Sequence, residues 1–151
     1  MAEGSNNKIE KKVWIQASAA TIFQALTEAK ALEKWFCDKA SCEPREGGEL
    51  SARWDFWKPP NKGRARFTRI VPDLALELQW IDDGGNAESS HTLSYEIIAR
   101  SGMTELVMID KDIMPLDEET FAFIDQGWNS VLRELKDYCE YKERATRKGN
   151  V

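Results

Sequence analysis

The sequence contains few residues that could carry acid–base chemistry. His91 is the only histidine. Its spacing from Leu93 and Tyr95 places it on the apolar face of a strand if that strand begins early, where an imidazole could act as a general base or hold a polar group of a ligand. The alternative, which we favour at this point, is a half-exposed side chain beside Ser89 and Ser90. Acid–base chemistry needs an orienting partner, and the sequence shows none nearby.

The other groups that could react or bind a metal are cysteines. Cys37, Cys42 and Cys139 form no CxxC pair, and their odd number argues against a disulfide framework, so we expect reduced thiols. With Asp38 and His91 they supply ligand types, but a structural zinc site requires four ligands in recognisable spacing. The sequence therefore predicts no metal and no cofactor.

Carboxylates and nucleophile motifs give no stronger signal. Asp110 and Asp112 flank Lys111, but carboxylates at strand ends are usually solvated, and we expect these to be so. No GxSxG, HExxH, phosphate-binding loop or GxGxxG occurs in a context that supports its chemistry. We therefore predict no catalytic residue.

Large rings are the remaining chemical feature, because the chain has six Trp, six Phe and three Tyr. For any single ring, core packing is the simpler interpretation. Taken together, they predict a cavity that holds an apolar or aromatic molecule, because one helix cannot fill a strongly bent sheet. Arg53 is a weak polar candidate, since its parity places it on the outer face. The predicted ligand-binding residues are Trp35, Trp54, Phe56, Phe67, Leu78, Trp80, His91, Tyr95, Phe121 and Trp128.

Hydrophobic periodicity predicts the elements that position these rings. A half-exposed strand over residues 9–16 precedes two short helices, the first capped by Ser18. Apolar alternation then predicts successive strands over 50–57, 63–71, 74–80, 92–100 and 104–113, separated by turns and not by helices. Such an order indicates an antiparallel meander. After Asp117, which is placed to cap a helix, apolar residues recur at three- and four-residue steps over roughly five turns.

Length and charge limit the remaining possibilities. The 151 residues fit one domain, which we expect over residues 8–143, between a disordered segment 1–7 and a basic flexible tail 144–151. The chain shows no secretory signal and no run approaching the roughly 20 apolar residues that span a bilayer, so we expect a cytoplasmic protein without membrane contact. A net charge of −5 argues against nucleic-acid binding.

Three ordered motifs carry a resemblance to a known family. They are ASAATIFQAL over residues 17–26, LEKWF over 32–36 and GWNSVLREL over 127–135, and Gly47-Gly48 matches a glycine pair before the first long strand. The sequence resembles the START and birch-pollen-allergen-like (SRPBCC) superfamily. Within it, the sequence is similar to the family named after the C-terminal domain of the activator of the ninety-kilodalton heat-shock-protein ATPase. The resemblance implies an α+β helix-grip fold, a curved antiparallel sheet with two short helices and a long C-terminal helix enclosing a cavity.

Fold alone does not decide the function, and three hypotheses stay open. The first is non-catalytic binding of a small apolar ligand in the cavity. The second, implied by the resemblance, is an interaction module with a chaperone partner. The third is an enzyme of the cyclase or dehydratase kind, which would need polar groups converging in the pocket. A homodimer is a further expectation, because a meander leaves edge strands and Trp57 points outward beside Pro59-Pro60.

Overall fold

The N-terminal elements follow the sequence prediction closely. The computed structural model describes residues 8–55, 61–81, 91–111 and 117–149. Strand β1 (Lys8–Ile15) leads into helix α1 (Ala19–Thr27) and helix α2 (Ala29–Trp35). The Ser18 hydroxyl oxygen accepts a hydrogen bond of 3.1 Å from the Thr21 backbone N–H. This confirms the predicted cap, which satisfies one of the free N–H groups at the start of a helix.

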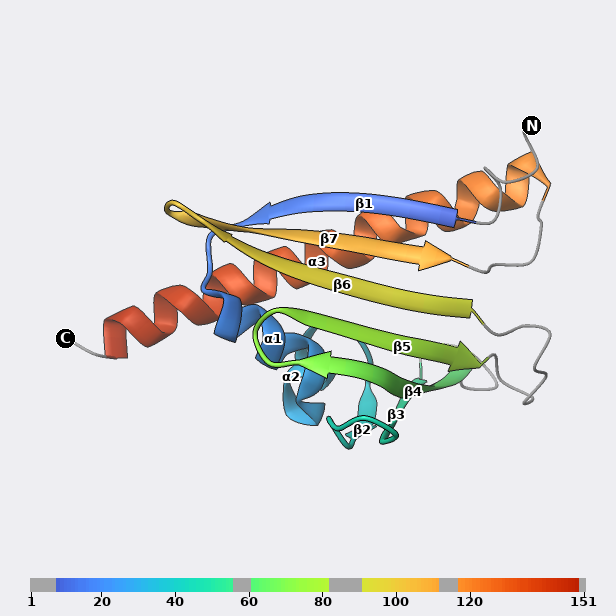
Figure 1. Ribbon diagram of the computed structural model, residues 1–151, viewed down its shortest axis with the longest axis horizontal. Helices are drawn as coiled ribbons and strands as arrows, with labels where there is room; N and C mark the ends of the chain where they lie inside the picture. Colours follow the sequence, from blue (N-terminus) through green and yellow to red (C-terminus); the bar gives the residue numbers. More distant parts are fainter. Residues whose placement is uncertain (1–7, 56–60, 82–90, 112–116, 150–151) are drawn as a thin grey trace.

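One antiparallel sheet of seven strands forms the front layer of the molecule (Figure 1), in the order β1-β7-β6-β5-β4-β3-β2. The predicted meander is confirmed, since each strand from β2 to β6 pairs with the next strand in the chain. Strand β1 joins β7 at the far side, so β1 and β2 are the two edges. The strands after β1 are β2 (Lys39–Cys42), β3 (Glu49–Trp54), β4 (Asn61–Val71), β5 (Ala75–Ile81), β6 (His91–Arg100) and β7 (Met103–Lys111).

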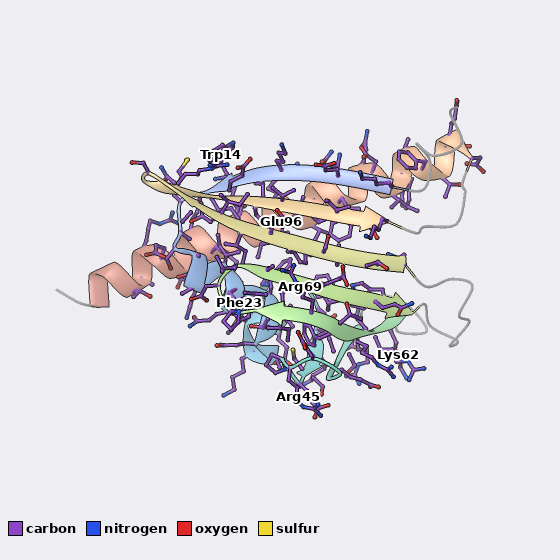
Figure 2. All side chains as sticks on the ribbon, viewed as in Figure 1. Trp14, Phe23, Arg45, Lys62, Arg69 and Glu96 are labelled. Atoms are coloured by element: carbon purple, nitrogen blue, oxygen red, sulfur yellow. The ribbon has the colours of Figure 1, made fainter. Side chains whose placement is uncertain are left out.

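Alternation along the strands separates an inner face from an outer one. On β3, Leu50 and Ala52 are buried whereas Ser51 and Arg53 are exposed. Charged side chains such as Arg69 on β4 and Glu96 on β6 lie on the outer face, away from the helices (Figure 2). The sheet therefore presents one apolar surface to the rest of the chain.

The glycine pair before β3 makes a turn that other residues would strain. Gly47 has φ +84°, a left-handed conformation that glycine adopts at little cost. A Cβ on Gly48 would lie 2.2 Å from the carbonyl oxygen of Glu43. The turn is tied to β4, because the Gly47 N–H donates to the Phe67 carbonyl and the Phe67 N–H to the Gly48 carbonyl. Both glycines are thus required by the backbone that positions β3.

Helix α3 (Glu118–Gly149) crosses behind the sheet as the second layer, beside α1 and α2 (Figure 1). The Thr120 N–H donates to the Asp117 carboxylate at 2.7 Å, which confirms the predicted cap and holds the pKa of that carboxyl below its usual range. Leu132, Leu135 and Cys139 are buried on its inner side. The helix continues through residues 144–149, which the sequence assigns to a flexible tail.

The far part of α3 is attached to the start of α1 by carboxylates. Glu140 accepts a hydrogen bond of 2.9 Å from the Gln16 N–H, and Glu143 accepts one of 3.0 Å from the Ser18 N–H. The sheet, the two short helices and the long helix together confirm the predicted α+β helix-grip fold. In the part of the chain that the structure describes, no helix is both long and apolar enough to cross a membrane.

Burial of Cys139 predicts a loss of stability at alkaline pH. Burial raises the pKa of the Cys139 thiol from 9.0 to about 12, with the nearby charges of Glu140 and Glu143 as lesser causes. The folded protein thus favours the neutral thiol, and this stabilisation is complete below pH 9.0 and is lost as the pH rises toward 12. As the pH rises from about 8 to about 10.5, the ionisation preference of the Cys139 thiol should lower the free energy of unfolding by about 2 kcal/mol. Urea denaturation at the two pH values would measure this change. The free energy of unfolding of Cys139→Ala should fall by correspondingly less over that interval. An equal fall in the two proteins would contradict the assignment of this pH dependence to Cys139.

Candidate functional site

A cavity of about 230 Å³ lies between the inner face of the sheet and the three helices. Its walls are almost entirely apolar. Seven of the residues predicted from the sequence line it, namely Trp35, Trp54, Leu78, Trp80, His91, Tyr95 and Trp128. Six further lining residues were not predicted, namely Leu26, Leu32, Phe36, Leu50, Leu93 and Val131. The rings that sequence parity directed inward therefore do gather around a common space.

Two predicted residues, Phe67 and Phe121, are not among the described residues that line the cavity, and a third, Phe56, cannot be placed. Phe67 on β4 is fully buried in the core, with 0% of its surface exposed. Phe121 on α3 is partly buried and packs against the core outside the cavity. Phe56, like the Trp57 expected at a dimer contact, lies outside the described residues. Arg53 pairs with Asp55 on the exposed side of β3 and takes no part in the lining, as its parity indicated.

Phe36 is the centre of the aromatic wall. Its ring centroid lies 5.2 Å from that of Trp35 and 5.2 Å from that of Trp54, the latter edge-on at 77°. The Trp80 ring lies 6.3 Å away. Contacts of this geometry are favourable beyond their buried area. Residue 36 follows the last turn of α2, where neither helical nor strand periodicity applies, and only its place beside Trp35 in the LEKWF motif could have suggested it.

Two indoles of the wall are oriented by backbone carbonyls. The Trp35 N–H donates to the Ala25 carbonyl at 2.9 Å, and the Trp54 N–H donates to the Phe36 carbonyl at 2.7 Å. The polar edge of each ring is thereby satisfied within the protein, which leaves the carbon surface for contact with a ligand. Gly63 on β4 allows the close packing of this wall, since a Cβ there would lie 3.1 Å from Trp80 Cζ3.

One polar cluster interrupts the apolar lining. His91 on β6 and Trp128 on α3 both bond to Asp110 on β7. The His91 Nδ1 atom lies 2.5 Å from Asp110 Oδ1, and the Trp128 N–H donates to Asp110 Oδ2 at 3.0 Å. Asp110 is 2% exposed, so the expectation that it is solvated is wrong. The His91 side chain is 24% exposed and lines the cavity, and it has the orienting partner that its sequence neighbourhood lacks.

Tyr95 adds a hydroxyl to the lining of the cavity. Burial raises the pKa of this hydroxyl, and the charge of Asp110 raises it further, so Tyr95 remains protonated across the physiological range. Within the described part of the chain its hydroxyl forms no hydrogen bond. The lining of the cavity thus combines a broad apolar surface with an imidazole and a phenol.

The metal-ligating side chains of the described residues do not gather in one place. Among the described residues, no three His, Cys, Asp or Glu side chains come together in a way that could hold an ion. Burial raises the pKa of the Cys37 and Cys42 thiols to about 11 each, so both are neutral near pH 7. Metal ligation requires the thiolate, which this environment disfavours.

Comparisons with known proteins agree with this architecture. The family model described as "Activator of Hsp90 ATPase homolog 1-like protein" matches residues 16–140. The solution structure of the Aha1 dimer from Colwellia psychrerythraea is 22% identical, with a TM-score of 0.75 over 88% of this chain and 96% of that one. Protein MLL2253 from Mesorhizobium loti is 15% identical, with a TM-score of 0.75 over 87% and 95%.

A third solved structure is also similar to this chain. CalU16 from Micromonospora echinospora is 17% identical, with a TM-score of 0.69 over 87% of this chain and 75% of that one. None of the curated proteins matches this chain. At these identities the solved structures establish the fold, whereas the family model covers most of the sequence.

Proposed function

The chain belongs to the Activator of Hsp90 ATPase homolog 1-like protein family, and from this premise we propose that it binds an apolar or aromatic small molecule without transforming it. The binding site is the cavity between the sheet and α3. The observation that carries the proposal is a space of about 230 Å³ walled by four tryptophans and a phenylalanine, with few polar groups in its lining. Ligand pockets typically combine apolar walls with a few placed polar groups.

A direct titration tests this proposal. Naphthalene matches the flat, apolar character of the walls, and four of the six tryptophans line the cavity, so its entry should change the intrinsic fluorescence. We expect a Kd of about 10 to 100 µM, equivalent to about 0.6 kcal/mol per carbon atom, within the range known for small ligands. Absence of saturable binding at the solubility limit of naphthalene would refute the proposal.

Two variants on α3 form the control for this titration. Val131→Phe adds a ring to a residue that lines the cavity and should weaken naphthalene binding at least about tenfold by filling the space. Ile124→Phe adds the same ring to a partly buried aliphatic position that does not line the cavity, and it should leave the Kd within about twofold. Equal effects of the two variants would mean that the ligand binds elsewhere.

A protein-interaction role is the second candidate, and its support is weaker. Four large hydrophobic side chains of the described residues are well exposed, but they lie on β1, in the turn between β4 and β5, and at separate points of α3. They are Trp14, Leu74, Phe123 and Tyr141. Self-association through edge strand β1 is compatible with its pairing on one side only, and the Colwellia protein is described as a dimer. A chaperone partner follows from the family name alone.

The cyclase or dehydratase alternative requires an acid–base set inside the cavity. His91 and Tyr95 supply two groups that could exchange protons, and Asp110 orients the first of them. The remaining lining residues are hydrocarbons and indoles, which neither donate nor accept protons in such reactions. We therefore assign the polar groups of the lining to recognition of the ligand.

A further inference from the structure

We infer that the Tyr95 hydroxyl recognises the ligand by donating a hydrogen bond to it, so that the site favours aromatic carbonyl compounds over hydrocarbons of the same shape. The inference rests on the proposed function, because it concerns the lining of the same cavity. It is carried by the position of Tyr95, which is buried on β6 and lines the cavity with a hydroxyl that forms no hydrogen bond within the described part of the chain.

The Tyr95 side chain is buried, yet its hydroxyl is not enclosed by the protein. The residue is only 6% exposed. Among the described residues, every side-chain nitrogen or oxygen atom that is closed off from solvent has a hydrogen-bond partner. A hydroxyl without a partner must therefore border an open space, and the space that Tyr95 lines is the cavity. The hydroxyl thus lies where a ligand can reach it.

The neighbours of Tyr95 in the sheet explain why its hydroxyl has no partner among the described residues. Tyr95 pairs with Leu76 on β5 and with Met108 on β7. Both of these side chains are fully buried, and neither carries an oxygen or a nitrogen atom. Two residues further along β7, the two oxygens of the Asp110 carboxylate are each engaged by another side chain. The hydroxyl is therefore available for a group that the ligand supplies.

The Tyr95 hydroxyl has a hydrogen to donate near neutral pH. Burial raises the pKa of Tyr95, and the charge of Asp110 raises it further, so the phenol stays protonated. A ligand carbonyl oxygen can accept this hydrogen. A hydrocarbon of the same shape would leave the hydroxyl unpaired and would exclude the water that could bond to it, which is costly. The preference for a carbonyl group follows from this difference.

The indoles of the lining are also compatible with an acceptor on the ligand. The N–H groups of Trp35, Trp54 and Trp128 all donate to acceptors within the protein. The Trp80 N–H forms no hydrogen bond within the described residues, and an indole N–H can only donate. A carbonyl oxygen therefore suits Trp80 as well as Tyr95, and substitution of Tyr95 distinguishes between the two donors.

Two flat probes of the same shape test the inference. The carbonyl oxygen of 2-acetylnaphthalene is replaced by a CH₂ group in 2-isopropenylnaphthalene, and the two molecules are otherwise the same. Their Kd values are measured by tryptophan fluorescence for the wild-type protein, Tyr95→Phe and Tyr138→Phe. Comparing the ratio of the two Kd values between proteins cancels the difference in hydrophobicity between the probes.

Tyr95→Phe should shift this ratio about five- to tenfold against the ketone, which is the contribution of one hydrogen bond. Tyr138→Phe is the matched control, because it removes the same hydroxyl from a partly buried tyrosine on α3 that is not among the lining residues. Its ratio should stay within about twofold of the wild-type value. An unchanged ratio in Tyr95→Phe, or an equal shift in the two variants, would overturn the inference.

Urea denaturation without any ligand gives a second readout. Because the Tyr95 hydroxyl has no partner within the described residues, Tyr95→Phe should leave the urea midpoint unchanged or raise it. Removing a hydroxyl that is held by an internal hydrogen bond would instead lower the midpoint. A clear fall in the midpoint, or failure of Tyr95→Phe to fold, would mean that the hydroxyl stabilises the core, and the inference would be wrong.

The outcomes separate the inference from the proposed function. If naphthalene binds but neither probe does, or if the ratio is the same in the wild type and Tyr95→Phe, the assignment of Tyr95 is wrong and the cavity remains a binding site. If naphthalene and both probes fail to bind, both claims fail. A ratio that shifts in Tyr95→Phe alone, without a fall in the urea midpoint, supports both.

Discussion

Replacing Phe67 with alanine is expected to lower the free energy of unfolding by about 3 to 5 kcal/mol, the usual cost of removing a fully buried ring. The ring is 0% exposed and belongs to the central core cluster. It lies on β4 next to the register shift between Phe67 and Arg69, where two backbone hydrogen bonds connect it to the Gly47-Gly48 turn. The surroundings cannot collapse freely into the space left behind, and urea denaturation would measure the loss.

Two comparisons decide whether Phe67 is a core residue or a ligand contact. Phe121→Ala removes the same ring from a partly buried position and should cost less than half as much. Phe67→Leu retains most of the buried volume, so naphthalene should bind to it within about threefold of the wild-type Kd. A stable Phe67→Leu protein that no longer binds naphthalene would show that Phe67 belongs to the site.

Asp110→Ala is expected to lower the free energy of unfolding by about 3 kcal/mol, because it removes the acceptor of two hydrogen bonds to a charged group. These bonds connect three elements, since His91 is on β6, Asp110 on β7 and Trp128 on α3. Without the carboxylate, the Trp128 N–H loses its partner at a partly buried position. Urea denaturation near pH 7 would measure the change.

Asp125→Ala is the matched control, as it removes the same side chain from α3. Asp125 pairs with Lys11 at 2.9 Å, but its side chain is 35% exposed, and pairs of this kind contribute less than about 1 kcal/mol. Similar losses for the two variants would mean that the bonds of Asp110 contribute no more than a surface ion pair. The expected difference instead identifies the buried carboxylate as the link between sheet and helix.

The fold could be predicted because it depends on local patterns. Alternation assigned Leu50 and Ala52 to the inner face, and the caps at Ser18 and Asp117 are where the sequence placed them. These signals are set by the two-residue repeat of a strand and by the free N–H groups at a helix start. The short edge strand β2 was missed, because four residues are too few for their alternation to indicate a strand.

The cavity itself was only partly predictable. Parity directs Phe67 and Trp80 inward equally, yet the first is core and the second lines the cavity. The difference depends on how far the helices stand from each part of the sheet, which is a property of long-range packing. Phe36, which lies between helix and strand, has no periodicity that could have identified it.

The pairing of His91 with Asp110 shows the same division between local and long-range features. The sequence by itself determined that His91 is the only imidazole and that it shares the parity of Leu93 and Tyr95. Only the tertiary structure decided its partner, because Asp110 lies 19 residues away and reaches it through the pairing of Leu93 with Asp110 across β6 and β7. Strand register and the crossing of α3 are non-local, so no spacing along the chain could have revealed the pair or the indole that holds it.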